Sequence, residues 1–207
     1  MISIAVPTGV LLPDCLALLG RAGVVDLGAD DLGRRLLLDQ GDTRVVLVRP
    51  TDVPAYVEHG AVDLGIAGQD VIWETVGRPY ELADLGFGPC TFVLAAPEDS
   101  QLRGPETWPP SLRVATKYPL ATTRALRRLG QAAEVVHLHG SVELAPLVGL
   151  ADAIADLTAT GRTLRENRLR AIAELGRSTA RLIANQAALK TRWDTVGDVV
   201  ARIRAAA

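Results

Sequence analysis

Hydrophobic positions along the chain form short apolar runs that alternate with stretches in which apolar residues recur at helical spacing. Short apolar runs bounded by Gly, Pro or Asp predict buried strands, and amphipathic stretches predict helices. Strands are predicted at 2–6, 45–48, 63–66, 112–116, 134–138, 153–157 and 180–185, with extended segments at 82–88 and 91–96. Helices are predicted at 13–22, 53–59, 70–74, 119–129, 142–148, 163–169 and 195–206.

This alternation of strands and helices predicts an α/β fold with largely parallel sheet. The segment 97–110 contains Pro97, Pro105, Pro109 and Pro110 and resembles a loop. It is either a boundary between two lobes or a long surface loop within the second lobe.

Composition and charge limit the function. The chain has 207 residues, 48% of them hydrophobic but only 4% aromatic, which predicts a full aliphatic core. A net charge of −2 argues against an extended nucleic-acid surface, so phosphate groups would be bound locally. No apolar run reaches the roughly 20 residues of a membrane span, and 2–6 lacks the features of a signal peptide. We expect a soluble, cytoplasmic protein.

A candidate phosphate site follows the strand at 153–157. Asp156 ends this strand, the sequence Thr158-Ala159-Thr160-Gly161-Arg162-Thr163 comes next, and a helical pattern follows. Backbone N–H groups at a helix start attract anions, and glycine allows a close approach of the backbone. Hydroxyls of Thr160 and Thr163 can donate to phosphate oxygens, while Asp156 can accept from ribose hydroxyls. These features predict a ribose 5-phosphate site. The alternative is that either threonine caps the helix, with Glu166 completing a capping box.

Four other polar residues lie at predicted helix starts or turns. Glu143 follows Gly140-Ser141 at a predicted helix start, where it either contacts substrate or compensates a helix dipole. Asp70 either faces substrate or caps its helix. Lys117 and Tyr118 precede Pro119 in a predicted strand-to-helix turn and are candidates for substrate contact, with a surface turn as the alternative.

Several collinear segments resemble one known family. They are 48–58, 60–71, 84–88, 114–119, 140–146 and 149–164, and they resemble the short-form ATP phosphoribosyltransferases, which catalyse the first step of histidine biosynthesis. The resemblance implies transfer of 5-phosphoribosyl from phosphoribosyl pyrophosphate to N1 of ATP adenine. Pyrophosphate is released, and Mg²⁺ enters with the substrates rather than being held by the protein.

The resemblance also implies an architecture and partners. It implies a two-lobed, periplasmic-binding-protein-like (type II) fold with a central cleft, lobe I being 1–89 plus 176–207 and lobe II being 90–175. Since nothing follows Ala207, the short form is expected, with a regulatory subunit related to histidyl-tRNA synthetase. A dimer of catalytic chains within a hetero-oligomer is also implied.

At residue level, the resemblance assigns the phosphoribosyl pyrophosphate loop to this chain's candidate loop. The implied substrate-binding set is Asp152, Asp156, Thr158, Ala159, Thr160, Gly161, Arg162 and Thr163, together with Glu143, Asp70, Lys117 and Tyr118. In this set Lys117 is expected to meet an ATP phosphate and Tyr118 to flank adenine. Glu143 is expected to bind ribose hydroxyls or a magnesium-bound water. Arg34 matches a Ser-Arg-Lys-Leu segment of the family and is expected to contact the departing pyrophosphate, unless it is a surface arginine.

Three positions depart from the family pattern. Thr8 and Val10 replace two cations, and Gln69 stands where lysine is frequent. These losses are expected to weaken binding of a charged substrate unless Arg21, Arg35 or a partner compensates. The missing cations at Thr8 and Val10 favour an alternative function, a non-catalytic two-lobed binding or regulatory module, whereas the intact loop at 156–163 opposes it. A third hypothesis, hydroxymethylbilane synthase, requires a cofactor-bearing cysteine, and the sequence around Cys15 and Cys90 does not provide one.

Overall fold

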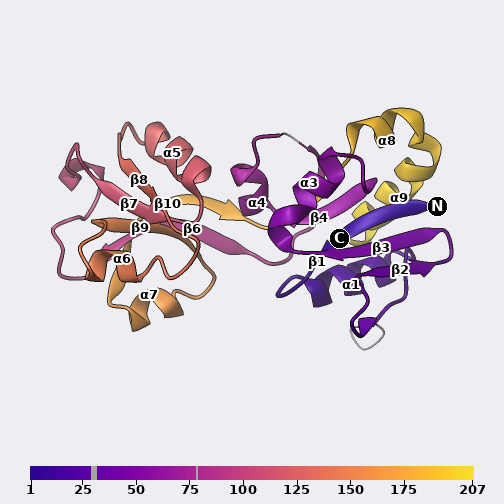
Figure 1. Cartoon of the computed structure of the whole chain (residues 1–207), viewed down its shortest axis with the longest axis horizontal. Helices are drawn as coiled ribbons and strands as arrows, with labels where there is room; N and C mark the ends of the chain where they lie inside the picture. Colours follow the sequence, from indigo (N-terminus) through magenta and orange to yellow (C-terminus); the bar gives the residue numbers. More distant parts are fainter. Residues whose placement is uncertain (29–31, 78) are drawn as a thin grey trace. The chain divides into compact units, whose positions relative to one another are not determined.

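The computed structural model describes residues 1–28, 32–77 and 79–207 (Figure 1). The chain divides into two compact units: unit 1 comprises Met1–Gly88 and Thr179–Ala207, and unit 2 comprises Pro89–Ser178. The lobe boundary that we expected between 175 and 176 falls inside strand β10 (Leu169–Ser178). This strand pairs with β6 (Cys90–Pro97) as far as Ser178, so unit 2 extends to the end of the strand.

Unit 1 is built on a six-stranded sheet in the order β2-β3-β1-β4-β11-β5. The strands are β1 (Ile2–Pro7), β2 (Leu37–Gln40), β3 (Thr43–Val48), β4 (Leu64–Gly68), β5 (Tyr80–Asp84) and β11 (Ala180–Ala184). Strand β1 is parallel to β3 and β4, whereas β2, β5 and β11 pair antiparallel with their neighbours.

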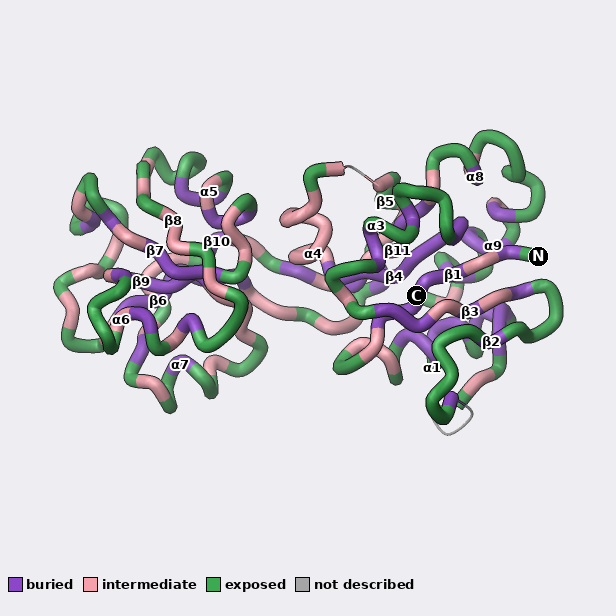
Figure 2. Tube along the Cα trace, in the orientation of Figure 1, coloured by how far each residue is buried: buried purple, intermediate pink, exposed green. Residues whose placement is uncertain are grey.

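Helices cover both faces of this sheet. Helix α1 (Leu12–Arg21) and helix α9 (Trp193–Ala206) share one core with Ile4 and Val6 of β1, and α3 (Val53–Glu58) shares another with Ala5. Adjacent residues of a strand point to opposite faces, which explains why β1 supplies both cores. Buried residues follow the strands in Figure 2. Short helices Pro50–Asp52, α4 (Gln69–Glu74) and α8 (Gln186–Thr191) complete the unit.

Unit 2 has a five-stranded sheet in the order β10-β6-β9-β7-β8. Its remaining strands are β7 (Arg113–Thr116), β8 (Glu134–His137) and β9 (Ala153–Thr158). Helices α6 (Leu144–Leu147) and α7 (Arg162–Glu166) lie on one face and α5 (Pro119–Arg128) on the other (Figure 1). On the first face, Ile154 of β9 packs in one hydrophobic core with Ala145 and Leu164 from the two helices. The proline-rich segment 97–110 is a loop within this unit that includes the short helix Pro105–Thr107.

The structure corrects several expectations. The sheets are mixed rather than largely parallel, because β10 and β6 pair antiparallel with each other and β6 pairs antiparallel with β9. The helix predicted at 163–169 ends at Glu166, and Leu169 already belongs to β10. Strand β10 was not predicted because two register shifts break its alternation of buried and exposed residues. Strand β2 and helix α8 were also missed.

Candidate active site

Three parallel strands of unit 2 end at the same edge of its sheet. Strand β7 lies between β8 and β9, with Thr116 opposite both His137 and Ala155. The turns that follow these strands therefore meet at one edge, where open α/β sheets bind ligands. They carry Lys117 and Tyr118 after β7, the segment before α6 after β8, and the candidate loop after β9.

The loop between β9 and α7 is fixed by a left-handed glycine and by two hydrogen bonds between side chains and backbone. Gly161 has φ +71°, a left-handed conformation that glycine adopts at least cost. Its N–H donates to Oγ1 of Thr158 at 2.8 Å, and Arg165 Nη1 donates to the carbonyl oxygen of Thr160 at 3.0 Å. The turn is therefore fixed before any ligand binds.

The capping alternative does not describe this loop. Helix α7 begins after Gly161, and no side chain accepts a hydrogen bond at its cap. Glu166 does not reach back to complete a capping box, because its Oε1 lies 2.7 Å from Nε of Arg162 in an ion pair. Thr160 and Thr163 are both exposed, so their hydroxyls can reach a ligand.

Asp156 lies at the carboxyl end of β9 with a side chain only 19% exposed. Burial raises the pKa of this carboxyl, the Lys117 ammonium and the Leu157 N–H lower it, and the Glu143 charge raises it further. Lys117 Nζ lies 3.4 Å from Asp156 Oδ1. Three predicted site residues, one from β9 and two from the turns after β7 and β8, therefore interact at this edge. The Asp156 carboxylate, which pairs with Lys117 through Oδ1, can also accept hydrogen bonds from ligand hydroxyls.

Tyr118 is positioned by buried Thr116. Thr116 Oγ1 donates to the Ala155 carbonyl at 2.7 Å and accepts from the Tyr118 N–H at 2.9 Å. The Tyr118 ring packs edge-on against Phe92, with centroids 5.7 Å apart and an interplanar angle of 76°. This ring is a partly buried packing element of unit 2, and its contact with adenine stays a prediction.

Asp152 does not belong with the loop. It precedes β9, at the opposite end of the strand from Gly161. Its Oδ1 lies 2.8 Å from Arg113 Nη2, and its Oδ2 accepts from the Arg113 backbone N–H at 2.9 Å. Arg113 therefore binds this carboxylate, and the ion pair links the start of β7 to the start of β9. Sequence reasoning grouped Asp152 with Asp156 because both flank the same apolar run.

We expect Asp152→Asn to lower the free energy of unfolding by about 1 kcal/mol at neutral pH, because the ion pair is only partly shielded from solvent. Arg113 lowers the pKa of this carboxyl, so the stabilisation is lost as pH falls through the lowered pKa. The difference between wild type and variant should therefore shrink in acid, as measured by urea unfolding. Substrate KM values should not change. A raised KM would return Asp152 to the site.

The other candidates lie in unit 1. Arg34 is exposed, in the turn before β2 rather than on a strand. Asp70 is in the first turn of α4, which has no side-chain cap. Thr8 directly follows β1, and Val10 is 93% exposed. Gln69 makes a contact that the sequence did not predict: its Oε1 accepts from Arg181 Nη2 at 2.9 Å.

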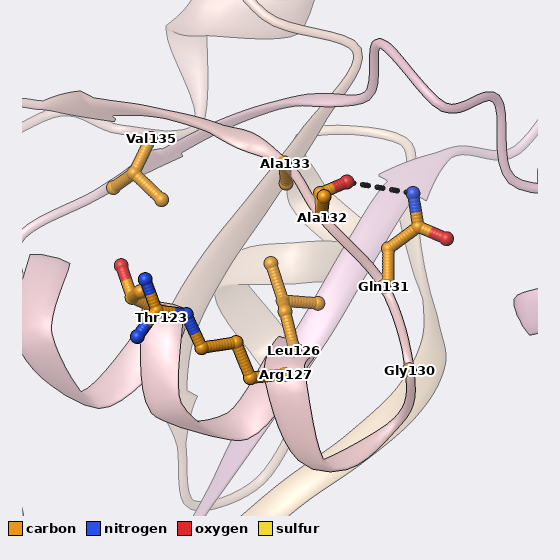
Figure 3. Close-up of a pocket in the computed structure, with 8 residues that line it drawn as sticks. All are labelled: Thr123, Leu126, Arg127, Gly130, Gln131, Ala132, Ala133 and Val135. Carbon is orange, nitrogen blue, oxygen red and sulfur yellow. Dashed lines mark hydrogen bonds between the residues drawn. The ribbon is translucent and has the colours of Figure 1, made fainter.

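One cavity of unit 2 lies apart from the predicted site residues. This cavity of about 350 Å³ lies between Leu126 and Arg127 of α5 and the segment Gly130–Val135 (Figure 3). Gln131 on its rim donates to the Ala132 carbonyl at 2.7 Å. This cavity contains none of the predicted site residues, and we assign it no role.

Among the described residues, no group of three or more His, Cys, Asp or Glu could hold a metal ion. In the part of the chain that is described, no helix has the length and apolar character needed to cross a membrane.

Comparison with known proteins first defines the class. The two α/β units match solved periplasmic binding proteins in fold alone. One is the alkanesulfonate-binding protein SsuA from Xanthomonas axonopodis pv. citri, at 17% identity and TM-score 0.60, covering 99% of this chain and 72% of that one. The chain thus has the two-lobed fold of periplasmic binding proteins.

The family follows from closer matches. A family model described as "HisG: ATP phosphoribosyltransferase" matches residues 49–205. An ATP phosphoribosyltransferase of Rubrobacter xylanophilus is 47% identical, with 97% of this chain and 94% of the relative covered. The ATP phosphoribosyl transferase (HisG:HisZ) complex from Thermotoga maritima matches at 31% identity and TM-score 0.83, over 100% of this chain and 98% of that one. The chain belongs to the HisG family of ATP phosphoribosyltransferases, pentosyltransferases of the first step of histidine biosynthesis.

Proposed function

We propose that the β9–α7 loop binds the 5-phosphate of phosphoribosyl pyrophosphate and that this chain transfers the phosphoribosyl group to N1 of ATP adenine. The observation that carries the proposal is the loop itself. Gly161 is left-handed, its N–H is fixed on Thr158, and the exposed hydroxyls of Thr160 and Thr163 flank it. The backbone N–H groups of Ala159 and Arg162 would also donate to the anion.

We assign the remaining interactions with the substrates to the other candidate residues. Asp156 would accept hydrogen bonds from the ribose hydroxyls, with Glu143 as its neighbour on the same sheet edge. Displacement at a sugar carbon requires positioning and charge stabilisation more than a covalent nucleophile. Lys117 would contact an ATP phosphate and Tyr118 would flank adenine. From unit 1, Arg34 would meet the departing pyrophosphate and Asp70 would contact substrate.

Mg²⁺ and a regulatory subunit complete the proposal. Mg²⁺ would enter with the substrates and neutralise charge on the pyrophosphate. The Thermotoga maritima relative was solved as a HisG:HisZ complex, which supports a partner subunit of that kind for this chain. We propose a dimer of catalytic chains within such a hetero-oligomer, located in the cytoplasm where its substrates are made.

The test is a turnover assay with the full chain. The purified chain is mixed with ATP, phosphoribosyl pyrophosphate and Mg²⁺, with and without a HisZ-type subunit, and phosphoribosyl-ATP is followed by absorbance. We expect product, and more of it with the partner. Absence of product in every condition, together with no saturable binding of phosphoribosyl pyrophosphate, would reject the proposal.

One observation favours a second function, a non-catalytic binding or regulatory module. Neither Thr8 nor exposed Val10 supplies a cation where the carboxyl end of β1 meets its neighbours. Such a module would bind phosphoribosyl pyrophosphate or ATP in a calorimetric titration but form no product with any partner. Product formation would exclude it.

Thr163→Ala is expected to raise the KM for phosphoribosyl pyrophosphate by about tenfold, because one hydroxyl donor to a charged phosphate oxygen is lost. The thermal midpoint should not change, since Thr163 is exposed and does not cap α7. The matched control is Thr195→Ala, an exposed threonine in the first turn of α9. Equal KM values for the two variants would contradict a phosphate contact by Thr163.

A further inference from the structure

A largely buried arginine links three segments of unit 1. The Arg181 side chain on β11 is 17% exposed; its Nη1 lies 3.2 Å from Glu81 Oε1 and its Nη2 lies 3.0 Å from Asp84 Oδ2. Asp84 also accepts, on Oδ1, from the Thr179 hydroxyl at 2.7 Å and the Gly86 N–H at 3.0 Å. Two carboxylates already exceed the single positive charge of the guanidinium, so its third partner is not needed for neutrality.

That third partner is Gln69. Arg181 Nη2 donates to Gln69 Oε1 at 2.9 Å, and the Gln69 backbone N–H donates to the Thr179 carbonyl at 3.0 Å. A guanidinium only donates hydrogen bonds, so it can bind only the carbonyl end of the amide. The amide NH₂ group therefore points away from Arg181, and both the backbone and the side chain of Gln69 are held in place.

Gln69 lies where a ligand would meet the parallel part of the unit 1 sheet. It directly follows β4, and β4 runs parallel to β1, with Ala5 opposite Gly65. Ligands of open α/β sheets bind at the carboxyl ends of parallel strands. An ammonium at position 69 has no acceptor for the Arg181 guanidinium, whereas a neutral amide can accept from Arg181 and still donate on its other side.

We propose that Arg181 is a positioning residue for the transferase reaction, which holds the Gln69 amide so that its NH₂ donates to a phosphate oxygen of one of the two substrates. The proposal rests on the proposed function for the identity of these substrates. Phosphoribosyl pyrophosphate and ATP offer the same phosphate chemistry, and separate titrations distinguish them.

The decisive comparison is Gln69→Glu against Gln69→Met. Glutamate keeps an acceptor for Arg181 but loses the outward donor and adds a negative charge, whereas methionine loses both contacts. We expect Gln69→Met to weaken the binding of one substrate by about tenfold. Gln69→Glu should weaken it further while keeping the wild-type thermal midpoint. Dissociation constants for ATP and for phosphoribosyl pyrophosphate are measured by calorimetry on the full chain with its partner subunit.

A double-mutant cycle separates positioning from a purely structural role. Arg181→Met should weaken binding of the same substrate in the wild-type background but not in the Gln69→Met background, because Arg181 acts through Gln69. If Arg181→Met fails to fold, Arg181→Lys replaces it in the cycle, and the Gln69 pair remains decisive. Unchanged affinities in Gln69→Glu, or additive effects in the cycle, would overturn the proposal. If the wild type binds its substrates but forms no product, affinity shifts in these variants would still support the positioning of Gln69 by Arg181. The absence of product would then reject the proposed reaction.

Discussion

Gly161→Val is expected to reduce kcat/KM for phosphoribosyl pyrophosphate by about a hundredfold, because a misplacement near 1 Å in a positioning loop has effects of that size. Gly161 has φ +71°, where a β-branched residue is strongly disfavoured. An added Cβ would lie 3.0 Å from Arg165 Nη1, the group that donates to the Thr160 carbonyl. The loop would therefore have to rearrange, and the free energy of unfolding should fall by about 1–2 kcal/mol.

Gly130→Val is the matched control for this strain. Gly130 has φ +73°, follows α5 in the same unit, and has no heavy atom within 4 Å of an added Cβ. Its substitution should destabilise unit 2 by a similar amount and leave KM unchanged at a temperature where both variants are folded. Equal kinetic losses in the two variants would show that the Gly161 effect is a general consequence of destabilisation, not of loop geometry.

The loop was predictable from sequence because its determinants are local. An apolar strand, a threonine, a glycine and a helical pattern lie within one short segment, and Gly161 bonds to Thr158 three residues away. The helix boundary was less predictable, since the chain turns directly from α7 into β10. The bulges of β10 are set by its pairing with β6, which no local pattern reports.

The partners of the site residues were not predictable from sequence, because they depend on strand register. Lys117 meets Asp156 only because β7 and β9 are parallel neighbours, with Thr116 opposite Ala155. The same pairing brings Arg113 to Asp152, which lies at the opposite end of β9 from the loop. Sequence spacing placed both carboxylates beside one strand but could not show that Arg113 pairs with Asp152 at one end and Lys117 with Asp156 at the other.

Asp156→Asn should separate activity from stability. The carboxylate would accept from ribose hydroxyls, and hydrogen bonds to charged groups are worth about 1.5–3 kcal/mol each, so kcat/KM should fall by about 10- to 100-fold. Stability should rise at neutral pH, because burial raises the pKa of Asp156 and the folded state disfavours its ionised form. Lys117 is 39% exposed, so water can hydrate its ammonium once the charge of Asp156 is removed.

The pH dependence of that gain gives the sharpest test. Well below the ordinary carboxyl pKa of 3.8, the wild-type group is protonated in both the folded and unfolded states, and wild type and variant should differ least. As pH rises toward the raised folded pKa, the unfolded chain releases its proton first and the wild type loses stability relative to Asp156→Asn.

Asp152→Asn, the same substitution at the other end of β9, should show the reverse pattern: lower stability at neutral pH and unchanged kinetics. Urea unfolding from acid to neutral pH, with turnover measured in parallel, compares the two variants. A loss of both stability and activity in Asp156→Asn would mean that this carboxylate serves the fold of unit 2 rather than the substrate.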